Sequence, residues 1–292
     1  MMNVGLIARL GAGLRRRRLA ALLGAGLLTT SAAACSPAAV PASSRCSTDA
    51  ITLSCPYRTA TLTAAGEARQ ILWQVPRGDA PEGGWPTVIM FQGSVATPAL
   101  TWTASPAEPF GAYSQTQVVQ RLLDNGYAVL TPATHLAGVT FWDTNNPLVP
   151  DYLSSNDHAL MLRLFDALDS GMFGDASTER MYATGISSGG YMTSRMAVSY
   201  PGRFKALAVA AGSYATCLGP LCDVGPIRDD HPPTLFLHGG LDPVVPLATM
   251  DAYRDMLRQK GIETRRVVDP TALHRWISSS PAEVLAWFDK HP

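Results

Sequence analysis

The sequence has no excess of charge of either sign. Lys and Arg number 23, Asp and Glu also number 23, and only 16% of the 292 residues are charged. Nucleic-acid-binding proteins cluster an excess of Lys and Arg, and disordered chains combine high net charge with low hydrophobicity. Neither description fits this chain, in which 47% of the residues are hydrophobic. We therefore expect a globular protein with a large buried core and no nucleic-acid partner.

Acidic residues are absent from the first 34 positions. This segment contains Arg9 and the arginine run 15–18, then the apolar stretch 19–28, then small residues up to Ala34. That order is typical of a secretory signal peptide. A transmembrane anchor is the alternative, but about 10 to 16 apolar residues are fewer than the ~20 that span a bilayer. We expect residues 1–34 to be a signal peptide, and the arginines also permit twin-arginine export.

The site of signal cleavage has two interpretations. The residues before Cys35 resemble a bacterial lipoprotein box, in which the cysteine becomes the lipidated first residue. The usual leucine of that box is missing, and the Ala-x-Ala pattern equally suits ordinary signal peptidase. The protein is therefore expected to be secreted, with lipid anchoring at Cys35 as its one possible membrane attachment.

Cysteine is scarce and is never spaced as Cys-x-x-Cys. No histidine lies within a few residues of a cysteine either, so a zinc site is not favoured and no metal is expected. Without Cys35 four cysteines remain, and an even number in an exported chain implies disulfides. Three pairings are possible. We favour Cys46–Cys55 and Cys217–Cys222, because each closes a short loop.

Long linkers and internal repeats are also missing. Residues 35–57 are rich in Ala, Pro and Ser and are predicted to form an N-terminal tether and loop. From residue 58 to 292, strand-like and helix-like segments alternate, which predicts one α/β domain with a mostly parallel central sheet and helices on both faces. The predicted strands are 59–64, 69–76, 87–92, 127–131, 180–184, 205–210, 234–238 and 264–268. The predicted helices are 115–125, 156–170, 189–200, 248–260 and 281–290.

Ser187 lies in a Gly-x-Ser-x-Gly pattern between a predicted strand and a predicted helix. The pattern alone is weak, but a tight strand-to-helix turn strains the serine backbone and exposes its hydroxyl at the carboxyl end of the sheet. Gly185 and Gly189 remove the Cβ atoms that would clash in such a turn. A glycine-rich phosphate turn or a plain tight loop is the alternative interpretation. We predict that Ser187 is a nucleophile.

A serine nucleophile needs a base and a carboxylate that orients the base. Strand–turn–helix serine enzymes carry these groups in the order Ser, Asp, His. His274 follows the last predicted strand and is the predicted base; Asp242 follows strand 234–238 and is the predicted acid. The less favoured candidates are His231, His238, His291, Asp229, Asp230 and Asp269.

Such an enzyme also needs two backbone N–H groups that stabilise the developing negative charge. The amide of Ser188, which follows the nucleophile, is the first predicted donor. The second is expected in the loop after strand 87–92, from Ser94 or, less favoured, Gly93. An ordinary strand-ending turn is the alternative for this loop.

These motifs together resemble the secreted polyhydroxyalkanoate depolymerases of the α/β-hydrolase superfamily. The resemblance rests on segments 180–197 and 200–212, on the Asp242 loop 241–246 and on His274-Arg275-Trp276, and it covers roughly residues 58–292. The extracellular medium-chain-length depolymerases are the most similar subgroup. The chain departs in one place, because many relatives begin the oxyanion loop with His-Gly and this chain has Gln92-Gly93.

The resemblance implies an α/β-hydrolase fold and a serine esterase that cleaves polyester through an acyl-enzyme. It implies no metal, no organic cofactor and no protein partner. Its insoluble substrate, most plausibly medium-chain-length polyhydroxyalkanoate, must be adsorbed without a separate binding domain. A general exported carboxylesterase or serine peptidase of the same fold is the alternative, and the intact triad disfavours a non-catalytic binding lipoprotein.

Adsorption would fall to apolar side chains near the site. Loops 99–114 and 136–153 carry more large apolar residues than solvated loops usually do, although core packing explains them equally well. The predicted substrate-binding residues are Phe141, Trp142, Trp102 and Trp276. Because only about two dozen residues separate strand 205–210 from the next strand, we expect no large lid.

Overall fold

The computed structural model describes residues 44–135, 140–146, 148–149, 151–217 and 221–292, all within the unit Val40–Pro292. Its centre is an eight-stranded sheet in the order β11-β10-β9-β8-β5-β7-β4-β3. The pairs from β11 through β7 are parallel, whereas β7–β4 and β4–β3 are antiparallel. The strands are β3 (Arg58–Ala64), β4 (Glu67–Gln74), β5 (Trp85–Phe91), β7 (Ala128–Pro132), β8 (Ala176–Ile186), β9 (Phe204–Ala210), β10 (Thr234–Gly239) and β11 (Thr264–Asp269).

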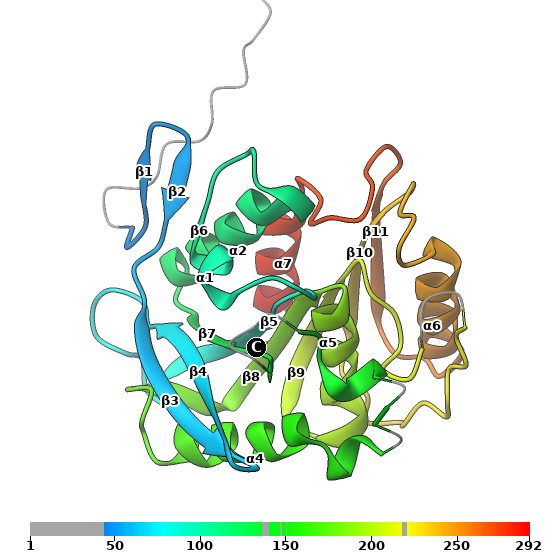
Figure 1. The fold of residues 1–292 in the computed structure, drawn as a ribbon, viewed down its shortest axis with the longest axis horizontal. Coiled ribbons are helices and arrows are strands. Elements are labelled where there is room, and N and C mark those ends of the chain that lie inside the picture. Colours follow the sequence, from blue (N-terminus) through cyan, green and yellow to red (C-terminus); the bar gives the residue numbers. More distant parts are fainter. Residues whose placement is uncertain (1–43, 136–139, 147, 150, 218–220) are drawn as a thin grey trace, which may run out of the picture. The chain divides into compact units, whose positions relative to one another are not determined.

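Helices cover both faces of this sheet (Figure 1), as the sequence predicts. The side chains of β5 alternate between the two faces: Val88 and Met90 pack with α2 and α7, and Ile89 and Phe91 pack with α4 and α5. All four are fully buried, so the strand is an apolar run, as expected of a parallel strand covered on both sides. The longer helices are α2 (Ala112–Asp124), α4 (Asn156–Asp169), α5 (Ser188–Ser199), α6 (Leu247–Gln259) and α7 (Ser280–Lys290).

Each predicted strand and helix corresponds to one of these elements, and the α/β-hydrolase fold is confirmed. The elements that the sequence did not predict are short. They are β1 (Ser47–Asp49), β2 (Thr52–Ser54), β6 (Thr103–Ala104), α1 (Pro98–Trp102), and the single turns η1 (Pro109–Gly111), η2 (Asp143–Asn145) and η3 (Tyr152–Ser154). Two to five residues are too few to show an alternating or helical pattern.

The N-terminal region differs from the predicted tether. β1 and β2 form a hairpin, and β2 pairs with β6, so that Leu53 lies opposite Ala104. The amide of Cys55 also donates to the carbonyl of Trp102 at 2.8 Å. The described part of the segment, residues 44–57, is therefore folded onto the rest of the unit, and the boundary predicted at residue 58 falls inside it. The predicted signal peptide and Cys35 lie outside the described residues.

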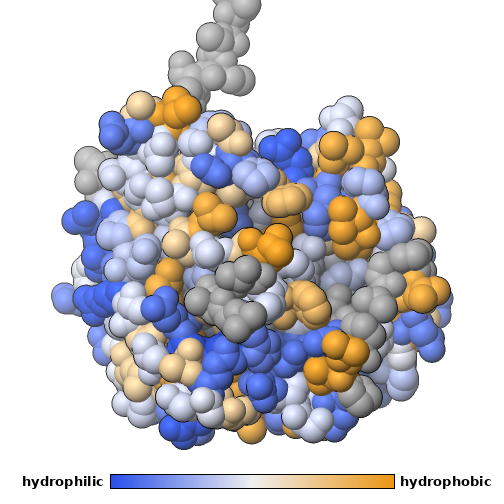
Figure 2. All heavy atoms as spheres, viewed as in Figure 1, coloured by the Kyte–Doolittle hydropathy of each residue, from blue (hydrophilic) through white to orange (hydrophobic). Residues whose placement is uncertain are grey.

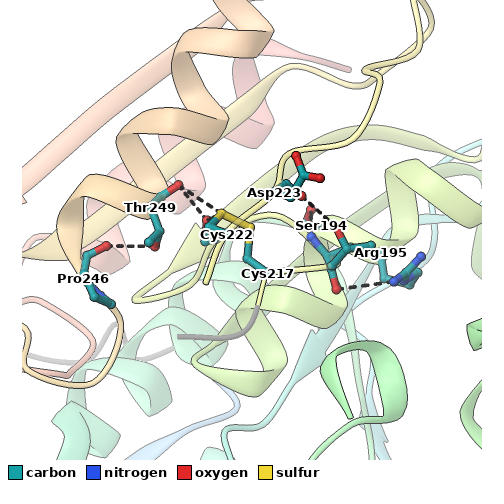
Figure 3. The surroundings of a disulfide bond; sticks show 10 residues. Ser194, Arg195, Cys217, Cys222, Asp223, Pro246 and Thr249 are labelled. Carbon is teal, nitrogen blue, oxygen red and sulfur yellow. Dashed lines mark hydrogen bonds between the residues drawn. A yellow bond between two sulfur atoms is a disulfide. The ribbon is translucent and has the colours of Figure 1, made fainter. Parts of the chain in front are cut away.

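Both predicted disulfides, Cys46–Cys55 and Cys217–Cys222, are confirmed. The second lies between α5 and α6 (Figure 3). Its surroundings are tied to both helices, because Ser194 accepts a hydrogen bond from the amide of Ala215 and Ser213 donates to the carbonyl of Thr249. The described residues between β9 and β10, which are 211–217 and 221–233, contain no helix. Among the described residues, no helix has the length and apolar character needed to cross a membrane.

Candidate active site

Ser187 occupies the sharp turn between β8 and α5. Its φ of 57° and ψ of −124° place a non-glycine residue in a strained conformation. The neighbouring glycines make the turn possible. A Cβ on Gly185 would lie 2.5 Å from the carbonyl oxygen of Gly189, and a Cβ on Gly189 would collide with the carbonyl oxygen of Phe91. The structure thus has the strand–turn–helix geometry that the Gly-x-Ser-x-Gly pattern predicts.

His274 and Asp242 are brought together from the loops after β11 and β10. The Nδ1 atom of His274 donates to Oδ2 of Asp242 at 2.8 Å, and the Asp242 side chain is fully buried. Burial by itself raises the pKa of Asp242. The hydrogen bonds from His238, His274 and the backbone amides of Val245 and Val244 outweigh burial and hold that pKa well below its usual range. Asp242 is therefore a carboxylate, and it fixes the His274 tautomer whose Nε2 is free to act as a base.

Ser187 and His274 line the same cavity of about 280 Å³. The wall is formed by the loops after β5, β8, β10 and β11 together with η1 and the start of α2, because the carboxyl ends of parallel strands meet at one edge of a sheet. The ring of Phe110 lies edge-on to that of His274, with 6.1 Å between the ring centres. The other lining residues are mainly apolar: Gly93, Ser94, Val95, Ala96, Leu100, Pro109, Ala112, Gln115, Ile186 and Val244.

None of the less favoured acids and bases lines the cavity. Asp229 and Asp230 are exposed and pair with Lys260 and Arg228, and Asp269 accepts hydrogen bonds from its own loop. His231 is buried against Tyr253, and burial lowers its pKa to about 4. His238 is buried and donates from Nε2 to the carbonyl of Val245, so it supports the Asp242 loop. His291 follows α7 at the C-terminus.

The three residues predicted to form the oxyanion hole surround Ser187. Ser188 is the first residue of α5, where helix geometry leaves the N–H groups without an intrahelical acceptor. Gly93 packs directly against Ser187, because a Cβ at position 93 would lie 3.6 Å from the Cβ of Ser187. Ser94 lines the cavity beside it. Gln92, which stands where many relatives have histidine, is buried and donates to the carbonyl of Ala96 across the loop.

Three of the four predicted substrate-binding residues are corrected by the structure. Trp102, Trp142 and Trp276 are fully buried, and none of them lines the cavity. They are core residues because an indole ring buries a large apolar area, and two of the rings also have hydrogen-bond partners. Nε1 of Trp102 donates to Thr131, and Nε1 of Trp142 donates to the carbonyl of Gln92. Phe141 is exposed, as predicted, but lies outside the cavity wall.

The sequence analysis did not single out Val95 and Val244 as part of the cavity wall. Val95 has a φ of 56° and Phe110 has a φ of 57°, although neither is glycine. Positive φ at a β-branched or aromatic residue leaves no mark in the sequence. The apolar loop 99–114 did give a signal for two other wall residues, Leu100 and Phe110.

A second group of titratable side chains lies outside the cavity. His135, Asp143 and Asp157 place possible ligand atoms within 4.8 Å of one another, close enough for a metal ion. Their charges are already balanced, because Arg69 lies 2.7 Å from Asp157. The hydrogen bond to Asp143, with the charge of Asp157 and a bond to Glu67, raises the pKa of His135 to about 9 against the effect of burial. We describe the group as an ion-pair network.

Comparisons with known proteins identify the class. The model of the dienelactone hydrolase family matches residues 107–286, which is more than half of the chain. The chain belongs to this family of α/β-hydrolases and is an ester hydrolase. A solved carboxylesterase from Bacillus cereus shares the fold, with a TM-score of 0.53 and 12% identity over 77% of this chain and 95% of that one. A dienelactone hydrolase structure from Klebsiella pneumoniae gives a TM-score of 0.50 and 20% identity over 80% and 98% of the two chains.

A more specific match comes from a curated relative. A poly(3-hydroxyoctanoate) depolymerase from Pseudomonas fluorescens is 49% identical over 261 residues, which cover 86% of this chain and 92% of the relative. The resemblance inferred from the motifs is therefore confirmed.

Proposed function

We propose that this protein hydrolyses the ester bonds of polyesters, with medium-chain-length polyhydroxyalkanoate as its substrate class, and that Ser187, His274 and Asp242 form its catalytic triad. The observation that carries the proposal is the shared cavity. A strained serine and a histidine that is hydrogen-bonded to a buried carboxylate face one predominantly apolar space. The name of the 49% identical relative supports the choice of polymer.

In the proposed mechanism, the Ser187 hydroxyl attacks the ester carbonyl while Nε2 of His274 takes its proton. Asp242 keeps Nδ1 of His274 protonated and stabilises the imidazolium that forms. The tetrahedral intermediate collapses when His274 protonates the departing alkoxide, which leaves an acyl-enzyme on Ser187. A water molecule, deprotonated by His274, then releases the hydroxy acid or oligomer and restores the serine. The step requires no metal or organic cofactor.

The amide of Ser188 and an amide of the Gly93–Ser94 loop are proposed to bind the oxyanion. Ser188 begins α5, whose N-terminus carries a partial positive charge from the helix dipole. Gly93 packs against Ser187, and both Gly93 and Ser94 line the cavity that Ser187 lines. Two fixed donors in a largely apolar site stabilise the developing charge more strongly than water does.

The cavity favours an aliphatic acyl group. Its volume of about 280 Å³ lies at the lower end of the range for ligand pockets, and Val95, Leu100, Phe110 and Val244 form much of its wall. A short alkyl chain fits such a space, and the polymer backbone must continue outside it. The described lining residues other than His274 carry no charged side chain that would recognise a peptide terminus or an ionic substrate.

Exposed large hydrophobic residues that line the cavity, or that lie close in sequence to the site residues, are proposed to form an apolar rim that adsorbs the polymer. We define the rim as Val95, Phe110, Phe141, Leu241, Val244 and Leu273. Each is an exposed large hydrophobic residue, with exposed fractions from 44% for Phe141 to 72% for Val95. Figure 2 shows hydrophobic residues gathered near the centre of this face and toward β10 and β11. A contiguous exposed apolar patch is a mark of an interaction surface.

Export is proposed for the N-terminal segment. Residues 1–34 have the composition of a signal peptide, with lipidation at Cys35 as a variant, and cleavage there leaves residues 35–292 as the mature chain. The two disulfides support this proposal, because they persist in oxidising compartments. The mass of the N-terminal peptide of protein secreted from the producing cell will identify the cleavage site and any attached lipid.

Clearing of polymer latex tests the proposed function. The purified protein is expected to clear medium-chain-length polyhydroxyalkanoate, to clear short-chain polyhydroxybutyrate more slowly, and to lose both activities in Ser187→Ala. Hydrolysis of a soluble nitrophenyl ester is measured in parallel. If neither latex clears while the soluble ester is hydrolysed, the polyester assignment is wrong and the protein is a general exported esterase.

A further inference from the structure

Trp142 connects the two sides of the proposed oxyanion hole. Its backbone amide donates to the hydroxyl of Ser188 at 2.9 Å, and Nε1 of its indole donates to the carbonyl of Gln92 at 3.0 Å. Ser188 supplies one proposed oxyanion donor. Gln92 immediately precedes Gly93 and Ser94, which supply the other. One fully buried residue is thus hydrogen-bonded to both walls, through its backbone amide on the side of Ser188 and through its indole on the side of Gln92.

The neighbouring residues strengthen the connection on the side of the Gln92 loop. The carbonyl of Thr140 accepts a hydrogen bond from the amide of Val95 at 3.3 Å, and the side chain of Gln92 donates to Ala96 across the loop. The ring of Trp142 also packs edge-on against Phe91, at 5.1 Å between ring centres, where β5 ends. These contacts hold the loop that follows β5 in one position relative to Ser187.

The ion-pair network in turn anchors Trp142. The next residue, Asp143, donates from its amide to Asp157 at 2.6 Å and accepts a hydrogen bond from His135 at 3.1 Å. Asp157 is fully buried and paired with Arg69, which also donates to the carbonyl of Ala133. The backbone at Trp142 therefore has little freedom to shift.

We propose that Trp142 is a positioning residue that sets the separation between the two oxyanion donors. The inference rests on the proposed function, because it assigns the Ser188 and Ser94 amides to the oxyanion. It also gives a reason for serine at position 188: the hydroxyl is the acceptor that fixes Trp142, while the amide of the same residue faces the reaction. Trp142 spans the gap between the two donors, because its indole N–H bonds to the carbonyl of Gln92 after β5 and its backbone amide bonds to the hydroxyl of Ser188 at the start of α5.

Displacement of an oxyanion donor is expected to weaken the stabilisation of the transition state more than the binding of the substrate. Oxyanion donors must lie about 2.7–3.1 Å from the position that the charged oxygen reaches, which differs from that of the ground-state carbonyl. A small displacement of one donor therefore lowers kcat and leaves KM nearly unchanged. The His274–Asp242 pair is untouched, so the pH dependence of kcat is expected to stay the same.

The test uses two variants. Trp142→Phe deletes the indole N–H that bonds to Gln92, and Ser188→Ala deletes the hydroxyl that accepts from the backbone amide of Trp142. Trp102→Phe is the matched control, because Trp102 is equally buried and its Nε1 also donates one hydrogen bond, to Thr131 away from the cavity. Soluble-ester kinetics, affinity for an alkylboronic acid that mimics the tetrahedral intermediate, and thermal unfolding are measured for each variant of the full chain.

We expect kcat to fall about 10- to 100-fold in Trp142→Phe and Ser188→Ala, a range below the loss of a whole oxyanion donor. Boronic acid affinity should fall in parallel, KM should change less than about threefold, and Trp102→Phe should match the wild type in kinetics. If both variants keep the kcat and boronic acid affinity of Trp102→Phe, the positioning role is wrong. If Trp142→Phe does not fold, Ser188→Ala alone decides. Failure of the proposed function is distinct, because it is observed in the wild type: either no latex clears, or no ester is hydrolysed at all.

Discussion

Two histidine–carboxylate groups in this protein have opposite surroundings. At His274, Nδ1 is bonded to Asp242, and the ring lies in the cavity that Ser187 also lines. At His135, both nitrogens are engaged, with Nδ1 at 2.7 Å from Glu67 and Nε2 at 3.1 Å from Asp143. The first ring retains a nitrogen that can accept a proton. The second is surrounded by three carboxylates, including Asp157 at 3.5 Å, and its pKa is raised to about 9.

The comparison shows that a histidine beside an aspartate does not by itself indicate a base. A base must be neutral at the working pH and have one nitrogen free toward the substrate. His135 meets neither condition, because it is held as a cation that joins β4 to the start of α4. We therefore propose that the same residue types serve catalysis in one group and stability in the other.

The largest expected effect comes from making the same substitution, histidine to asparagine, in each of the two groups. His274→Asn is expected to lower kcat for a soluble ester on the order of 10⁴-fold, because the proton acceptor is lost. His135→Asn should lose far less activity, since its side chain does not line the cavity and acts on the site only through the anchoring of Trp142. Steady-state kinetics of both purified variants checks this, and a comparable loss in His135→Asn would contradict the distinction.

The reverse contrast is expected for stability. Asp157 is fully buried and paired with Arg69, so Asp157→Ala leaves a buried guanidinium without its partner and should cost about 3–5 kcal/mol of unfolding free energy. Asp242→Ala should lower activity far more than Asp157→Ala does. Urea denaturation and ester kinetics of the pair will show whether the two effects separate. If Asp157→Ala and Asp242→Ala lower the unfolding free energy equally, the ion-pair network makes no special contribution to stability.

The pH dependence of stability provides a smaller and graded difference. The pKa of His135 is about 9 in the folded protein and near 6.5 when unfolded. A pKa raised by folding stabilises the fold fully below pH 6.5, and this contribution is lost as pH rises toward 9. The unfolding free energy of the wild type should therefore fall between pH 6.5 and 9 more steeply than that of His135→Gln. If the unfolding free energies of the wild type and His135→Gln fall with pH at the same slope, the protonation of His135 does not stabilise the fold.

The smallest expected effect concerns the surroundings of the two groups. His274 lines the cavity together with the rim residues Val95, Phe110 and Val244, whereas His135 does not line it. Leu273→Ser should reduce adsorption to polymer latex by about two- to fivefold, since one exposed leucine contributes on the order of 1 kcal/mol, and should leave soluble-ester kcat nearly unchanged. Leu162→Ser, which changes an exposed leucine on α4, is the control and should leave adsorption unaltered. If the two leucine variants adsorb alike, the rim has no special role.

Much of the fold could be predicted because its information is local. The buried strands are apolar runs, the helices show apolar residues at three-to-four spacing, and Gly185 and Gly189 mark the turn at Ser187. The pairing of His274 with Asp242 followed from their places after β11 and β10, since those strand ends meet at one edge. Both disulfides followed from short loops between cysteines.

Other features depend on contacts between distant residues and could not be predicted. The sequence does not indicate whether a large apolar residue in a loop is exposed or buried. For this reason the substrate-binding role predicted for Trp102, Trp142 and Trp276 is wrong. Their burial depends on partners as distant as Thr131 for Trp102 and Gln92 for Trp142. The strained backbone of Val95 and Phe110 leaves no sequence signal, and the network of His135 joins residues from three separate segments.

Labelling with a fluorophosphonate tests the central claim most directly. This reagent phosphonylates a serine that a neighbouring base activates, and intact-protein and peptide mass spectrometry locate the modified residue. The account predicts one label per chain, on Ser187, at a rate that His135→Asn retains and His274→Asn loses. A label on another residue, or an equal labelling rate in His274→Asn, would contradict the assignment of Ser187 and His274.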